Sequence, residues 1–74
     1  MVVEEGIKYR YEFSDDKSDK FWEIVLNGDK YSVSYGRIGN KPQTRTKDFD
    51  SKEIAMKEAD KIVNAKMKKG YVLV

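Results

Sequence analysis

The sequence of 74 residues lacks two residue types on which many protein functions depend. It has no cysteine and no histidine, which excludes disulfide bonds, thiol nucleophiles, the usual zinc ligand sets and the commonest general base. Its apolar runs are only a few residues long, too short to span a membrane. The N-terminal stretch is acidic where a signal peptide would be basic and then apolar. These absences predict a cytoplasmic protein, or a nuclear one in a eukaryote, without enzymatic activity, cofactor or metal.

The composition is that of one small domain spanning residues 1–74. A chain of this length buries only about 60–65 % of its unfolded surface, so we expect no enclosed active site. Apolar residues make up 39 % of the chain and charged residues 38 %, which suits a single core with a heavily charged surface and predicts a monomer. The formal net charge of +2 is too small to indicate a polyanionic partner by itself. Any such inference depends on where the cations lie.

The hydrophobic pattern predicts an α+β fold, a small antiparallel sheet of four to five strands with one helix packed across it. Four stretches are expected to be strands, residues 7–13, 21–26, 30–36 and 43–49. Apolar and polar residues alternate in three of them, as in half-buried strands, whereas the second, residues 21–26, is more apolar and suits a strand covered on both faces. Between the second and third stretches, Asn27 and Gly28 are the two residues that most readily take the positive φ angles of a tight hairpin turn. The last four residues are expected to form a short strand or an apolar tail on the sheet.

After Phe49 the apolar residues recur at helical spacing instead, which predicts a helix from about residue 51 to residue 69. Either Asp50, paired with Glu53 in a capping box, or Ser51 can cap its start. The lysines of its last turn complement the negative end of the helix dipole. The residues expected on its buried stripe are Ile54, Ala55, Ala59, Ile62, Val63 and Met67.

The stretch from Gly36 to Lys47 has four cations and no carboxylate, an exception in a chain of nearly balanced charge. Tyr35 precedes it and can stack on a base or sugar, while amide and hydroxyl groups within it can bind phosphate. This combination is typical of a nucleic-acid-binding surface. The alternative is that the cations serve solubility and that Tyr35 belongs to the core, in line with Tyr31 and Val33. The cations are Arg37, Lys41, Arg45 and Lys47.

The order and spacing of several motifs resemble the WGR domain, a module of DNA-dependent poly(ADP-ribose) polymerases and of various bacterial proteins. The resemblance runs from about Tyr9 to Tyr71 and covers nearly the whole chain. It is carried by the segments Phe21-Trp22-Glu23-Ile24, Tyr35-Gly36-Arg37-Ile38-Gly39, Gln43-Thr44-Arg45 and Lys69-Gly70-Tyr71. The family fold is a small antiparallel sheet with one helix, in agreement with the pattern above.

The resemblance implies a non-enzymatic module that binds nucleic acid, DNA rather than RNA, at ends or breaks. Tyr35 stands at the position of the motif tryptophan that packs at the exposed DNA end, and Arg37 at that of the motif arginine. An alternative is a protein-interaction or interdomain module in which Arg37 is the docking residue. The resemblance includes nothing of the polymerase catalytic domain. The expected binding residues are Tyr35, Gly36, Arg37, Gly39, Lys41, Gln43, Arg45 and Lys47.

Overall fold

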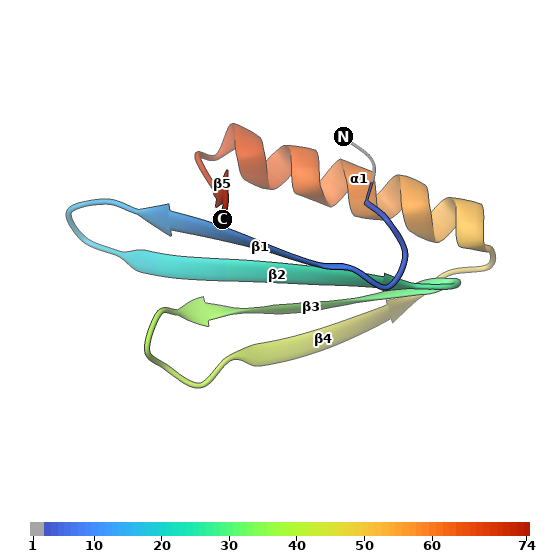
Figure 1. Cartoon of the computed structure of the whole chain (residues 1–74), viewed down its shortest axis with the longest axis horizontal. Coiled ribbons are helices and arrows are strands. Elements are labelled where there is room, and N and C mark those ends of the chain that lie inside the picture. The colour runs from blue at the N-terminus through green and yellow to red at the C-terminus, as the bar shows by residue number, and fades with distance from the viewer. Residues whose placement is uncertain (1–2) are drawn as a thin grey trace.

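The computed structural model describes residues 3–74 and consists of one antiparallel sheet with one helix across a face (Figure 1). The strands follow the order β4-β3-β2-β1-β5, so both edge strands come from the second half of the chain. The predicted α+β fold is confirmed, including the short last strand. The elements are β1 (Lys8–Ser14), β2 (Asp19–Asn27), β3 (Lys30–Arg37), β4 (Gln43–Asp48), α1 (Lys52–Lys68) and β5 (Val72–Leu73).

The hairpin of β2 and β3 fixes which residues face one another across the sheet. Its register runs from Asn27 opposite Lys30 to Lys20 opposite Arg37. The turn therefore consists of Gly28 and Asp29, one residue later than predicted. Gly28 has a φ of 62°, and no residue other than glycine has a positive φ among the described residues. A type II′ turn needs a positive φ only at its first central residue, which is why Asn27 can remain part of the strand.

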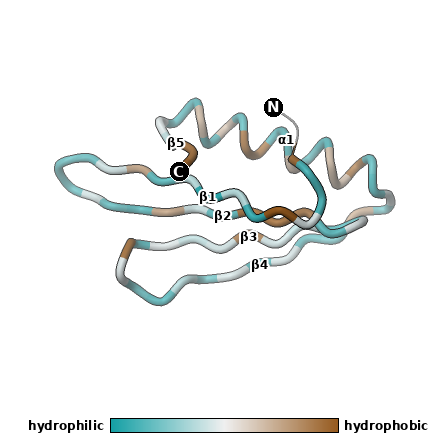
Figure 2. Tube along the Cα trace, viewed as in Figure 1, coloured by the Kyte–Doolittle hydropathy of each residue, from teal (hydrophilic) through white to brown (hydrophobic). Residues whose placement is uncertain are grey.

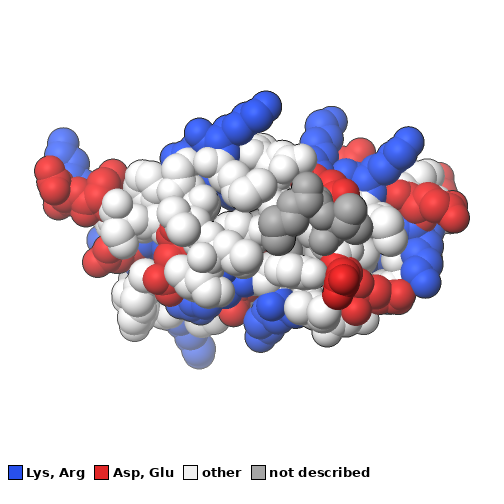
Figure 3. Space-filling view, turned by 45° about the horizontal axis from the view of Figure 1, so that its top comes forward, with Lys and Arg blue, Asp and Glu red and all other residues white. Residues whose placement is uncertain are grey.

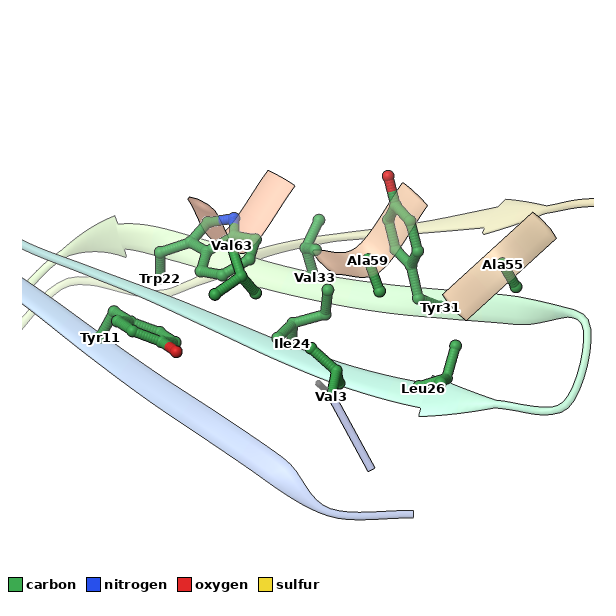
Figure 4. Packing of buried hydrophobic residues seen from close by; sticks show 10 residues of the cluster. All are labelled: Val3, Tyr11, Trp22, Ile24, Leu26, Tyr31, Val33, Ala55, Ala59 and Val63. Carbon is green, nitrogen blue, oxygen red and sulfur yellow. The ribbon is translucent and has the colours of Figure 1, made fainter. Parts of the chain in front are cut away.

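The core lies between α1 and the sheet face beneath it (Figure 4). The aromatic and aliphatic side chains of β1, β2 and β3 on this face are buried, and the trace is most hydrophobic in β2 (Figure 2). Small side chains at Ala55 and Ala59 and the side chain of Val63 face them from α1 and are fully buried. Small residues at these positions let the helix pack closely on the sheet.

Two residues of the predicted buried stripe are exposed. Ile54 is 42 % exposed and Met67 is 38 % exposed. Successive residues of a helix are rotated by about 100° around its axis. Ala55, Ala59, Ile62 and Lys66 therefore share one side of α1, and Ile54 and Met67 are each rotated about 100° away from it. The stripe is therefore narrower than predicted, and its last member toward the C-terminus is a lysine.

The helix begins with a serine cap. Ser51 is the N-cap, and its Oγ accepts a hydrogen bond from the backbone N–H of Ile54 at 3.2 Å. Of the two predicted caps, Asp50 is thus outside the helix.

The N-terminal segment packs against α1. Val3 is fully buried, and its N–H donates to Oδ1 of Asp60 on α1 at 3.0 Å. Within residues 3–74, no helix has the length and apolar character needed to cross a membrane.

Candidate nucleic-acid interface

A groove lies between the C-terminal end of α1 and the neighbouring ends of β2 and β3. It consists of two adjoining depressions of about 330 Å³ and 360 Å³ that share Lys20, Lys66 and Tyr71. We call it the basic aromatic groove, because cations and aromatic rings dominate its lining. Its principal lining residues are Phe13, Lys20, Trp22, Tyr35, Arg37, Ile62, Lys66, Lys69 and Tyr71.

The sheet supplies half of the groove through the register of the hairpin. Directly opposed residues of antiparallel strands point to the same face. Lys20 opposes Arg37, and two residues nearer the turn Trp22 opposes Tyr35. A pair of cations therefore lies beside a pair of aromatic rings on the helix side of the sheet, where the helix ends.

The end of α1 supplies the other half. The ammonium of Lys66 lies 5.8 Å from the ring centroid of Trp22 and 5.2 Å from that of Tyr71. Gly70 reverses the chain with a φ of 104°, and a Cβ there would come within 3.1 Å of the Phe13 ring. Glycine thus allows Tyr71 to fold back against Phe13, with the two ring centroids 5.5 Å apart.

The groove is strongly positive. Four cations line it, and no carboxylate does among the described residues. Burial lowers the pKa of Lys66 below its ordinary value, and the nearby charges of Lys69 and Lys20 lower it further. A cleft lined by charges of one sign concentrates the electrostatic field and attracts anions. The groove thus combines an excess of positive charge with aromatic side chains.

The first three residues of the Tyr-Gly-Arg-Ile-Gly segment line the sheet side of the groove. Arg37 is exposed at the end of β3, and Tyr35 is half-buried. Gly36, with a φ of 155°, lies opposite Phe21 within β3, and the backbone turns beyond the strand at Gly39, with a φ of 93°. The N–H of Ile38 donates to the carbonyl of Asp19 at 3.0 Å, which ties the motif to β2. The backbone thus holds Arg37 beside Lys20.

Tyr35 lies between the core and the groove. Its ring packs against the buried core cluster, and it also lines the groove. Its hydroxyl accepts a hydrogen bond from Nε of Arg45 at 2.9 Å and donates one to Oε1 of Gln43 at 3.3 Å. Gln43 and Arg45 therefore support Tyr35 from β4.

The four cations predicted to act together are not brought together. Lys47 opposes Tyr31, six residues before Arg37 on β3, which places the two cations about 20 Å apart along the sheet. Lys41 is exposed in the connection between β3 and β4. Arg37 alone of the four lines the groove. Lys41, Arg45 and Lys47 flank it on the side of β4.

Lys20, Lys66, Lys69 and Tyr71 also line the groove, and none of them is among the binding residues expected from the sequence. The lysines at the end of the helix were expected only to complement its dipole. Two signals could have found them. Lys66 continues the buried line of α1, and Lys20 and Arg37 are equally far from the Gly28-Asp29 turn.

The family model for the WGR domain matches residues 8–74, nearly the whole chain. The chain belongs to the WGR domain family. The WGR domain is a small module rather than a catalytic domain, and it is known for nucleic-acid binding.

The chain is similar to segments of three longer proteins. It is 48 % identical over 65 residues to the uncharacterized protein YfeS of Escherichia coli, with 88 % of this chain and 27 % of that protein covered. It is 37 % identical over 60 residues to the E. coli protein YehF, with 81 % and 22 % covered. A crystal structure of a Bacteroides fragilis protein matches with a TM-score of 0.89 and 43 % identity, over 92 % of this chain and 19 % of that one. The chain thus spans about a quarter or less of each.

Proposed function

We propose that this WGR domain is a non-enzymatic module that binds nucleic acid, DNA in the first place, with the phosphate backbone in the basic aromatic groove. The observation that carries the proposal is the set of four cations lining the groove without a carboxylate among the described residues. Cations in such a set bind phosphates and release counterions, which is the main source of affinity in nucleic-acid binding that does not depend on sequence.

Within the groove, Arg37 has a role that a lysine does not fill. Its planar guanidinium can hold a phosphate through two parallel hydrogen bonds, whereas an ammonium acts as a point charge. Gly36 and Gly39 set the backbone on either side of it. Lys41, Arg45 and Lys47 extend the positive surface onto β4, where a longer ligand would meet them, and Gln43 holds the hydroxyl of Tyr35.

A protein partner is the second candidate. It is favoured by the length of the relatives, since about three quarters or more of each lies outside the matched segment. In this case Arg37 would hold a carboxylate of a neighbouring domain by the same two hydrogen bonds.

The salt dependence of binding separates these candidates. We expect a fluorescently labelled DNA of about 20 nucleotides to bind with micromolar or weaker affinity at physiological salt. The logarithm of the affinity should fall with the logarithm of the salt concentration at a slope of about −3 to −4 when four cations each meet a phosphate. Duplex, nicked and single-stranded forms should be titrated in parallel. Affinity that stays constant across salt concentrations would contradict the proposal and support a protein partner.

A further inference from the structure

The floor of the groove is apolar, which phosphates alone do not explain. Beneath the cations lie Ile62 and the rings of Tyr35 and Tyr71, all half-buried, with Trp22 behind them. In a duplex the bases are stacked inside the helix, and the phosphates would leave this apolar surface uncovered. An unstacked base would cover it, since bases stack on aromatic side chains whatever their sequence.

The size of the groove and the placement of its cations fit one nucleotide. The depression over Trp22 has a volume of about 330 Å³, at the small end of the roughly 300–1,000 Å³ range of ligand pockets. Cations border it from two directions, Lys20 and Arg37 from the sheet and Lys66 from the helix. A base on the floor would thus have cations close to the phosphates on both of its sides.

We infer that the groove takes one unpaired nucleotide, with its base against Tyr71 and Ile62 and its flanking phosphates at Arg37 and at Lys66. The domain therefore binds single-stranded nucleic acid, or an unpaired stretch beside a duplex, more tightly than a blunt duplex. This inference rests on the proposed function and adds to it the class of nucleic acid.

The test uses ligands of equal charge that differ by one base. The first is an eight-unit phosphodiester chain of abasic tetrahydrofuran units, and the second is the same chain with one thymidine at its centre. We expect the thymidine chain to bind about 5-fold more tightly or better, because stacking on an aromatic side chain adds to the phosphate contacts. Trp22 is the only tryptophan of the chain, so its emission reports directly on a base entering the groove.

Two variants tie the difference to the groove. Tyr71→Leu keeps an apolar side chain but removes the ring, and should reduce the advantage of the thymidine chain to about 2-fold or less. Phe49→Leu removes a half-buried ring that packs on Tyr31, away from the groove, and should leave the advantage unchanged.

The possible outcomes keep the inference separate from the proposed function. Equal affinity for the two chains, or tighter binding of a blunt duplex of the same length, would overturn the inference. If that binding still weakened with salt and with loss of Lys20 and Lys66, the proposed function would stand. If neither chain bound, or if binding ignored these lysines, both would fail.

Discussion

The two ends of α1 differ in whether their charged side chains form ion pairs. Where the helix begins, charges are paired, since Nζ of Lys52 lies 3.0 Å from Oε2 of Glu5 and the other Glu5 oxygen accepts from the N–H of Gly28 at 2.8 Å. Acidic and basic side chains are mixed there (Figure 3). Where the helix ends, within the described residues, none of the cations lining the groove has an ion pair.

The difference indicates two purposes. Paired charges at the start of α1 join the N-terminal segment, the hairpin and the helix to one another, and contribute to folding. Like charges at its end repel one another, and this repulsion adds to the effect of burial, which is the larger cause of the lowered pKa of Lys66. A bound anion would remove this repulsion. The start of the helix thus serves stability, and the end is available for a ligand.

The largest expected effect is on binding, from removing two groove cations. The double variant Lys20→Gln and Lys66→Gln should bind DNA about 30-fold more weakly, because each charged contact contributes on the order of 1 kcal/mol. The salt slope should fall by about two units. The matched control is Lys57→Gln with Lys61→Gln, which removes the same charge from exposed positions of α1. Equal losses in the two double variants, measured by fluorescence anisotropy, would contradict a specific groove.

The next effect separates geometry from charge. Arg37→Lys should weaken DNA binding about 5- to 10-fold, because lysine cannot form the two parallel hydrogen bonds of a guanidinium. The salt slope and the melting temperature should stay nearly unchanged, since the charge remains and Arg37 is exposed. The control Lys41→Arg should change little. Wild-type binding combined with a lower melting temperature would mean that Arg37 is a structural residue.

A smaller effect is expected from pH. Lys66 lies among Lys20, Arg37, Lys69 and Tyr71, and its pKa is below the ordinary 10.5. As the pH rises toward the ordinary lysine value, Lys66 should lose its proton early and affinity should fall a few-fold. Lys66→Arg keeps its charge and should remove this early loss.

The sign for stability is opposite over the same pH range. The unfolded chain keeps the Lys66 proton longer than the folded chain does, so the free energy of unfolding should rise with pH there. Urea titrations of the free protein between pH 7 and 9.5 measure this change. Stability and affinity that both decline with pH would contradict the assignment of the effect to Lys66.

The smallest effect concerns the paired end of α1. The hydrogen bonds from Lys52 and from the N–H of Gly28 hold the pKa of Glu5 below 4.5, so its carboxylate contributes stability at neutral pH that is lost as the pH falls through its folded pKa. Glu5→Gln should lower the melting temperature slightly at pH 7, and the difference from the wild type should shrink as the pH falls through the folded pKa of Glu5. DNA binding should not change, and a loss of affinity in this variant would remove the contrast between the two ends.

The fold could be predicted because each of its elements has a local pattern. Alternation predicted β1, β3 and β4, a more apolar run predicted β2, and helical spacing after Phe49 predicted α1. The errors fall at boundaries, where two solutions differ little locally. Asp50 and Ser51 can both cap a helix, and Asn27 can end a strand or enter a turn.

The candidate site was harder to predict because its residues are distant in sequence. The cations between residues 37 and 47 were expected to act together because they are close in sequence, but the strand register spreads them along β3 and β4. Lys20 reaches Arg37 only through the hairpin register, and Lys66 reaches both only through helix packing. Tyr35 and Arg37, which line the groove, were expected as binding residues both from the charge pattern and from the resemblance to a family.

The most direct test of the groove is a titration of the ¹⁵N-labelled protein with a single-stranded oligonucleotide, followed by amide chemical shifts. The largest changes should occur at the amides of Lys20, Arg37, Lys66 and Tyr71 and at the indole N–H of Trp22. The far face of the sheet, where Ser32 and Ser34 pair with Thr46 and Thr44, should change little. Changes concentrated on that far face or on β4, with the groove signals unmoved, would contradict the proposal that the ligand lies in the groove.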